Sequence, residues 1–140
     1  MKSIADLKNT ENFKDGALEH ILEGQINKRG KAVGFHYEGF STAKGKIIDG
    51  TKSIPNDFVV YTGKVEVSGV PKISNGGKSI FFPEGWTAQD VADAINEAFN
   101  NKKFVQGTSN TYVGELSNGM QIEMYIDNVT GKIISAFPVQ

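Results

Sequence analysis

Glycine recurs at short intervals along much of the chain, and this spacing limits the fold more than any other feature of the sequence. The 140 residues contain 16 glycines and no cysteine. Glycine favours turns and weakens the interiors of helices and strands, so this distribution predicts short elements and a sheet-rich fold. With no disulfide framework, burial of apolar side chains has to stabilise the chain. Its length is sufficient for one domain with a core of its own.

Two segments have the residue pattern of helices. The clearer one follows the capping box Thr87–Asp90 and carries apolar residues at helical spacing. The other is expected between Asp15, as its N-cap, and Gly24, as the residue that ends it. We interpret residues 1–15 as a polar lead-in and residues 16–140 as the domain.

Short apolar or alternating segments, bounded by turn residues, predict the strands. Residues 38–56 hold three glycines and a proline with little periodicity, which indicates a long loop. The expected fold class is α+β: an N-terminal helical segment, then an antiparallel sheet meander with one inserted helix. The expected strands cover residues 32–37, 58–67, 79–82, 104–105, 111–113, 122–126 and 133–138.

Charge is nearly balanced over the chain but unevenly distributed. The formal net charge of −1 argues against a protein that coats nucleic acid non-specifically. Residues 1–78 contain 12 Lys or Arg and 9 Asp or Glu, whereas residues 79–140 contain 3 and 7. Lys28, Arg29 and Lys31 lie in the basic half. They are either ordinary solvated side chains or a basic rim that faces a phosphodiester.

His20 and His36 are the two histidines of the chain and are candidates for acid–base chemistry. Imidazole titrates near neutral pH, so a pair can accept and donate a proton within one reaction. Their spacing fits a helix end, a turn and the start of a strand, which could bring both rings to a shared site. From the residues alone, two unrelated histidines remain the alternative, one on a helix surface and one in a strand.

Three other functions fit parts of the sequence. A zinc hydrolase is poorly supported, because the histidines lack close ligand spacing and no cysteine assists them. Glu19 and Glu23 could supply paired-carboxylate chemistry, although such a pair on a helix more often forms a solvated face. A non-catalytic RNA- or protein-binding domain of the same fold would not need both histidines, and it is the main alternative to an enzyme.

Several segments together resemble one protein family. Residues 19–24, Glu-His-Ile-Leu-Glu-Gly, and residues 34–36, Gly-Phe-His, resemble the paired-histidine signature of the EndoU endoribonucleases. Residues 75–83 and 131–138 are similar to the bacterial branch of this family. The resemblance extends in order over nearly the whole chain. It implies for residues 16–140 an EndoU-like nuclease domain, with a fold of the barnase, EndoU, colicin and RelE type.

The resemblance implies RNA cleavage on the 3′ side of uridines that leaves a 2′,3′-cyclic phosphate, with no cofactor and little or no need for a metal. In the family pattern, the histidine matching His36 is the base and that matching His20 is the acid. A lysine that offsets charge on the phosphoryl oxygens is expected shortly before the strand at 79–82. Lys72 and Lys78 both lie there, and Lys78 is preferred because it adjoins the strand.

The closing motif of the family has a Ser or Thr and, two positions later, a Tyr or another aromatic residue. Ser135 and Phe137 match these positions. The Ser135 hydroxyl could pair with O2 or N3–H of uracil, and the Phe137 ring could stack on the base. Phe137 lacks a phenol hydroxyl, so any hydrogen bond from that group is lost. The alternative is that Phe137 is a core residue.

The resemblance also implies where such a domain acts. Bacterial members are usually C-terminal toxin domains of larger secreted proteins, including contact-dependent inhibition and other polymorphic toxins. We expect delivery to the cytoplasm of a target cell, an RNA substrate such as a tRNA, and a cognate immunity protein in the producing cell. DNA and membranes are not expected as partners. The domain should be a monomer or a heterodimer with its immunity protein.

The sequence shows no export signal of its own. No apolar run is long enough to span a membrane, and no signal peptide is evident at Met1. Any export is therefore expected to depend on sequence outside this chain.

Overall fold

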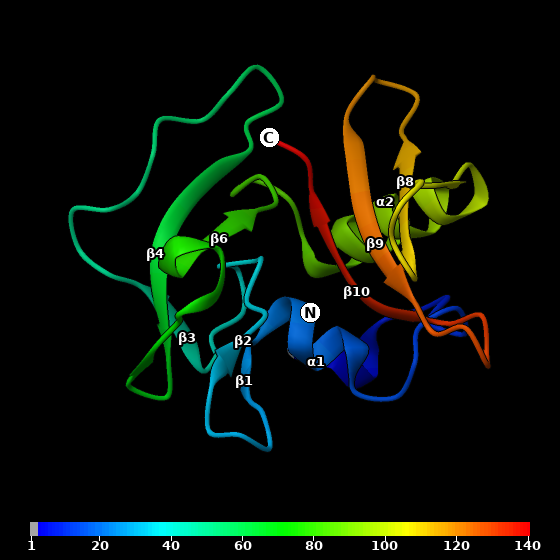
Figure 1. Ribbon diagram of the computed structural model, residues 1–140. Helices are drawn as coiled ribbons and strands as arrows, with labels where there is room; N and C mark the ends of the chain where they lie inside the picture. The colour runs from blue at the N-terminus through cyan, green and yellow to red at the C-terminus, as the bar shows by residue number, and fades with distance from the viewer. Residues whose placement is uncertain (1–2) are drawn as a thin grey trace.

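The computed structural model describes residues 3–140 and has a mixed α+β architecture (Figure 1). Within this range the two α-helices are α1, Ala17–Leu22, and α2, Ala88–Asn100. Two short 3-10 helices are η1, Ile4–Asp6, and η2, Ser74–Gly77. The predicted α+β class is confirmed.

The strands of residues 3–140 form two larger antiparallel sheets and one small hairpin. One sheet has the order β10-β9-β8-β7; the other has the order β3-β4-β5, with β6 also paired to β4. The hairpin consists of β1 and β2. The bounds are β1 Gln25–Ile26, β2 Ala32–Val33, β3 Gly45–Ile47, β4 Tyr61–Val67, β5 Val70–Pro71, β6 Lys78–Phe81, β7 Lys103–Phe104, β8 Thr111–Glu115, β9 Gln121–Ile126 and β10 Ile133–Pro138.

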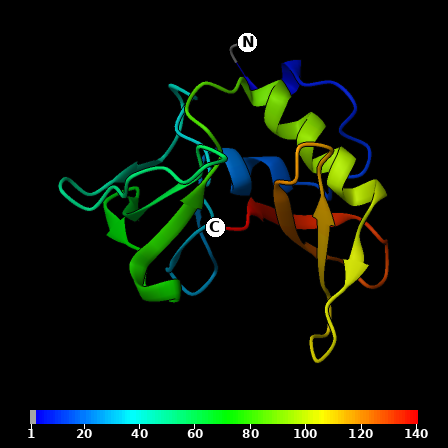
Figure 2. The same ribbon diagram turned by 90° about the horizontal axis from the view of Figure 1, so that it is seen from above.

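Consecutive antiparallel strands, as in the predicted meander, occur in β7–β10 and in β3–β5, but in two sheets and not in one. The earlier strands form a sheet of their own around β4, because α2 follows β6 in the chain and separates it from β7. Figure 2 shows the two sheets on either side of α1. β6 and β10 contact each other where the sheets meet, so residues from both halves of the chain come together there.

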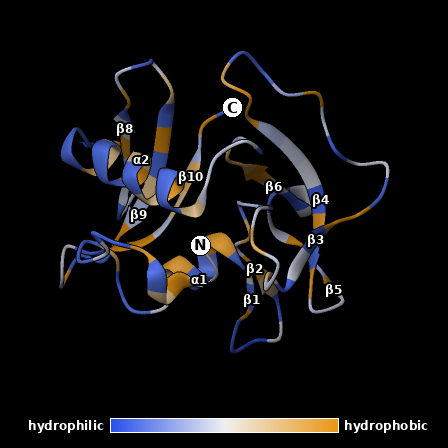
Figure 3. Ribbon diagram, turned by 180° about the vertical axis from the view of Figure 1, so that it is seen from behind, coloured by the Kyte–Doolittle hydropathy of each residue, from blue (hydrophilic) through white to orange (hydrophobic). Residues whose placement is uncertain are grey.

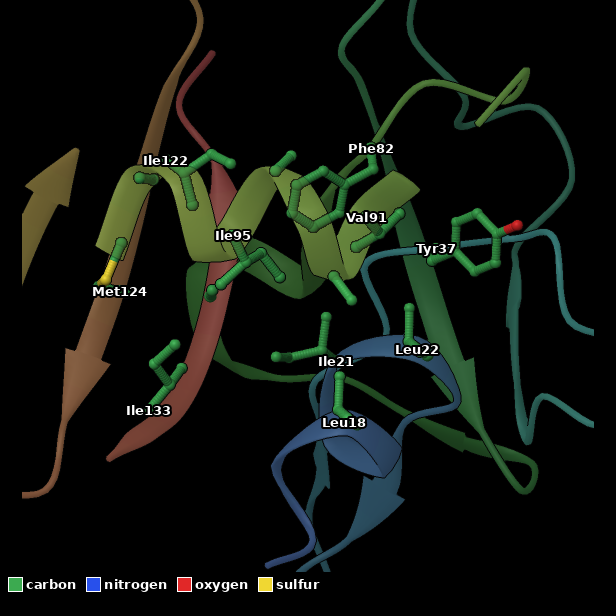
Figure 4. Packing of buried hydrophobic residues seen from close by; sticks show 14 of the residues in the cluster. Leu18, Ile21, Leu22, Tyr37, Phe82, Val91, Ile95, Ile122, Met124 and Ile133 are labelled. Atoms are coloured by element: carbon green, nitrogen blue, oxygen red, sulfur yellow. The ribbon is translucent and has the colours of Figure 1, made fainter. Parts of the chain in front are cut away.

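The main core lies between α2, α1 and the β7–β10 sheet. Val91 and Ile95 of α2 belong to one buried cluster with Ile21 of α1 and Ile122 of β9 (Figure 4). Figure 3 shows that the apolar side of α2 faces inward and its polar side outward. Burying one such aliphatic side chain contributes about 1.5–3 kcal/mol. This packing fixes α1 against β10 and thereby sets the position of the first histidine.

The ends of the helices follow the sequence prediction in part. At α2 the Thr87 hydroxyl accepts from the Asp90 N–H at 3.0 Å, and the Asp90 carboxylate accepts from the Thr87 N–H at 2.9 Å, so the predicted capping box is confirmed. The prediction of Asp15 as the cap of α1 is wrong. Gly16, with φ of 86°, occupies that position without a side-chain cap. Gly24, with φ of 79°, follows the helix as predicted.

Two strands are shorter than predicted, and three short strands, β1, β3 and β5, were missed. β2 ends at Val33 because Gly34 and Phe35 have φ angles of 78° and 71°, which are incompatible with an extended strand. β4 begins at Tyr61 rather than at residue 58, because the Asn56 side chain accepts hydrogen bonds from the backbone that precedes the strand. β3 lies within the predicted loop at 38–56.

The segment before α1 contributes to the core. Leu7 and Phe13 are buried in the main cluster, and the backbone of Phe13 bridges to Ile133 of β10. The predicted lead-in includes residues 1 and 2, which lie outside the described residues, and the boundary at residue 16 stays a prediction. Among the helices of residues 3–140, none has the length and apolar character needed to cross a membrane.

Candidate functional site

A cleft of about 580 Å³ lies where α1, β2, β6, β9 and β10 meet. Elements far apart in the sequence therefore supply its walls. Six of its lining residues are the candidates that the sequence singled out: His20, His36, Lys72, Lys78, Ser135 and Phe137.

The end of α1 and the chain after β2 are joined by backbone hydrogen bonds. The last carbonyls of a helix lack partners within the helix. Here the Phe35 N–H donates to the His20 carbonyl at 2.9 Å, and the His36 N–H donates to the Ile21 carbonyl at 2.7 Å. Gly34 permits this approach, since a Cβ there would lie 2.1 Å from the His20 carbonyl oxygen. This junction brings His36 beside His20.

His36 is fixed between α1 and β6. Its backbone carbonyl accepts from the Phe82 N–H at 2.9 Å, and its ring Nδ1 lies 2.8 Å from the Ile80 carbonyl oxygen. A carbonyl can only accept, so Nδ1 carries the proton and, in the neutral ring, Nε2 keeps its lone pair. The Phe137 ring stacks on the imidazole with centroids 5.2 Å apart. The ring of His36 thus has one defined tautomer and orientation.

Both histidines are neutral at pH 7 in the unliganded protein. Burial, followed by the positive charge of Lys72, lowers the pKa of His20 to about 4. Burial, followed by the charge of Lys72, also lowers the pKa of His36 to about 3, although the hydrogen bond to Ile80 opposes this shift. An anion in the cleft would raise the pKa of both histidines, because it would stabilise their charged forms.

The two candidate lysines have different environments. Lys72 follows β5 and is partly buried, and its ammonium donates to the Ser79 hydroxyl at 3.0 Å. Ser79 is fully buried and donates in turn to the Gly34 carbonyl at 3.0 Å. Burial lowers the pKa of Lys72 to about 8, so it is mostly protonated at neutral pH. Lys78, which the sequence favoured, is exposed at the start of β6.

Ser135 and Phe137 form the β10 side of the cleft. Ser135 is 4% exposed, and the Phe137 ring is half-buried. Glu123 and Tyr125 of the neighbouring strand also line the cleft, and the sequence prediction missed them. The signal that could have found them is the alternation of β9, where Ile122, Met124 and Ile126 are buried in the core.

The predicted basic rim does not line this cleft. Lys28, Arg29 and Lys31 are exposed at the turn of the β1–β2 hairpin, and none of them is among the lining residues. Over residues 3–140 the structure contains no group of three or more His, Asp or Glu side chains that could hold a metal ion.

Comparisons with known proteins identify relatives of this chain. The family model described as Bacterial EndoU nuclease matches residues 14–140. A protein named Toxin from Bacillus cereus is 51% identical over 137 residues, which is 98% of this chain and 25% of that protein. The chain therefore spans about a quarter of the length of this curated relative. No solved structure matches the chain.

Proposed function

This chain belongs to the bacterial EndoU nuclease family, a family of endoribonucleases, and on this premise we propose that it cleaves RNA on the 3′ side of uridines. The reaction would be attack of the ribose 2′-hydroxyl on the adjacent phosphorus. A new P–O2′ bond forms as the P–O5′ bond breaks. The products are a 2′,3′-cyclic phosphate and a 5′-hydroxyl.

The observation that carries this proposal is the shared cleft of His20, His36 and Lys72. His36 is suited to be the base, because its Nδ1–H is held by the Ile80 carbonyl and its Nε2 is free to accept a proton. Its low pKa keeps the ring unprotonated at neutral pH. It would remove the proton of the 2′-hydroxyl as that oxygen attacks.

His20 is suited to be the acid that protonates the leaving 5′-oxygen. It is less buried than His36, and its pKa is lowered less, to about 4. A bound phosphodiester would raise this pKa and so load His20 with the proton that it delivers.

Lys72 is the better candidate for the lysine that stabilises negative charge on the phosphoryl oxygens. It lines the same cleft as both histidines, and its charge lowers the pKa of both rings. The hydrogen bond to Ser79 holds its ammonium in place. A fixed cation in a partly buried cleft stabilises a developing anion more strongly than a mobile surface lysine does.

Ser135 and Phe137 are proposed to contact the base of the uridine. One face of the Phe137 ring lies against His36, so a base would stack on the part of the ring that the cleft leaves open. Such stacking contributes about 1–3 kcal/mol for each base.

We further propose that this chain is the toxin domain of a longer protein that is delivered to the cytoplasm of a target cell. The similarity to a protein named Toxin, of which the chain spans a quarter, supports this role. A nuclease of this kind requires an inhibitor in its producer, so a cognate immunity protein is the expected partner. The proposed domain is a monomer when free and a heterodimer with that partner.

The test uses synthetic RNA oligonucleotides with one scissile uridine. The wild-type protein should cut after the uridine and leave a cyclic phosphate, and chelators should have little effect. His20→Ala and His36→Ala should each reduce cleavage by about 10²–10⁴-fold, the usual contribution of one acid or base, while circular dichroism shows an intact fold.

The control substrates carry 2′-deoxyuridine or 2′-O-methyluridine at the scissile position. They should resist cleavage because the attacking hydroxyl is missing or blocked. Cleavage of the deoxyuridine linkage would exclude this mechanism. Binding of RNA without any cleavage by the wild-type protein would favour the alternative of a non-catalytic binding domain.

A further inference from the structure

The cleft has a basic side and a side that combines a carboxylate with aromatic rings. Lys72 and Lys78 enter from the segment around η2 and β6. Glu123, Tyr125 and Phe137 enter from β9 and β10. His36 connects the two sides, because it interacts with the charge of Lys72 and stacks on Phe137. This polarity would orient an RNA ligand with its phosphate near Lys72 and its base at β9 and β10.

Strand register sets the position of the carboxylate. Glu123 pairs with Phe137 across the β9–β10 ladder, and Tyr125 pairs with Ser135. Directly opposed residues of neighbouring strands share one face of the sheet. The Tyr125 ring meets Phe137 nearly edge-on, with centroids 5.8 Å apart. Glu123 therefore lies beside the two residues that are proposed to contact the base.

The Glu123 carboxylate has free hydrogen-bonding capacity. In the described part of the chain it forms no salt bridge, and the one hydrogen bond recorded for it comes from the Tyr125 hydroxyl at 3.4 Å. A carboxylate has about four lone-pair sites, so most of them remain open to a ligand. A phosphate would be repelled by this group, whereas a donor on the edge of a base would be attracted.

We infer that Glu123 is the residue that selects uracil over cytosine, by accepting a hydrogen bond from N3–H. This inference rests on the proposed ribonuclease function and adds to it. The two bases share O2, but uracil carries a donor at N3 where cytosine carries an acceptor. The Ser135 hydroxyl both donates and accepts, so it can satisfy either base. An ionised carboxylate only accepts, so it pairs with uracil N3–H and repels the cytosine N3 lone pair.

Ser135 and Glu123 therefore have different roles. The Ser135 hydroxyl can form a hydrogen bond with the edge of either pyrimidine. Its loss should therefore weaken cleavage after uridine and after cytidine alike. Glu123 faces N3, where uracil carries a donor and cytosine carries an acceptor. Cytosine could offer its N4 amino group to the carboxylate only by shifting along the Phe137 ring, which would move its ribose away from the histidines.

The test replaces Glu123 by Gln, which has the same shape but both donates and accepts. The substrates are two RNA oligonucleotides that differ only in U or C at the scissile position. The ratio of cleavage rates, U over C, should fall by about tenfold or more in Glu123→Gln, the effect of one discriminating hydrogen bond. Glu123→Asp, which remains acceptor-only, should keep uridine as the preferred base.

Glu115→Gln is the matched control. Glu115 is exposed on β8 and does not line the cleft, so this variant removes one negative charge from the same sheet without changing the site. Its U-over-C ratio should equal that of the wild-type protein. An equal fall in both Gln variants would show a general charge effect and would overturn the inference.

Binding of non-cleavable 2′-O-methyl oligonucleotides separates this inference from the proposed function. A protein that does not cleave RNA but binds the U oligonucleotide more tightly than the C oligonucleotide, with the preference lost in Glu123→Gln, would support the role of Glu123 and contradict only the nuclease proposal. An unchanged U-over-C ratio in Glu123→Gln, with the ratio lost in Ser135→Ala, would assign base selection to Ser135 and refute the inference.

Discussion

At the scale of single residues, burial distinguishes the two lysines of the cleft. Lys72 is partly buried and bound to Ser79, whereas Lys78 is exposed. Lys72→Ala should reduce the rate of RNA cleavage by about 10²–10³-fold, because a positioned cation at the phosphoryl group is lost. Lys78→Ala, the matched control, should change the rate by less than about tenfold, since an exposed lysine is mobile and screened by salt. Single-turnover rates at saturating enzyme measure both effects, and a larger loss in Lys78→Ala would reverse the assignment.

At the scale of elements, the junction between α1 and the chain after β2 determines whether the histidines meet. Gly34→Ala adds a methyl group that would lie 2.1 Å from the His20 carbonyl oxygen, at a φ of 78°. It should therefore move the two histidines apart and reduce cleavage by more than tenfold. Gly30→Ala is the matched control, since φ is 77° there and nothing lies within 4 Å of the added methyl. That variant should cost about 1–2 kcal/mol of stability from strain alone and leave the cleavage rate of the folded protein unchanged. Equal losses of activity in the two variants would show that backbone strain, not the contact with α1, is responsible.

At the scale of the whole molecule, burying two neutral histidines makes stability depend on pH. The pKa of His36 falls from 6.5 in the unfolded chain to about 3 in the folded protein. Between these values the unfolded state binds a proton that the folded state does not, so the free energy of unfolding decreases as pH falls below 6.5. The decrease from His36 at pH 5 should be about 2 kcal/mol, and His20, with a pKa of about 4, acts in the same direction. Urea denaturation at pH 7.5, 6 and 5 measures this decrease in the free energy of unfolding. His36→Gln should flatten this dependence, and a free energy of unfolding that is constant from pH 7.5 to 5 would contradict the buried neutral state.

The sequence by itself determined the elements with a strong local pattern and the identity of the candidate acid–base groups. The capping box at Thr87 and the alternation in β9 depend on neighbouring residues only, and both were predicted correctly. The same holds for the turn at Gly24, which ends α1. The paired histidines could be singled out because imidazole is the side chain that titrates near neutral pH, and because their setting resembles a family motif.

Tertiary structure alone decided how these groups are arranged. The environment of Lys72 depends on a hydrogen bond to Ser79, and that of Glu123 on its pairing with β10. The left-handed conformation of Phe35 likewise follows from the docking of its N–H on the His20 carbonyl. These contacts cannot be predicted from neighbouring residues in the sequence. Burial and charge proximity arise only when segments distant in the chain pack together. The sequence therefore identified the candidate groups of the cleft, and packing decided the burial of each lysine, the position of Glu123 and the ring nitrogen of His36 that carries the proton.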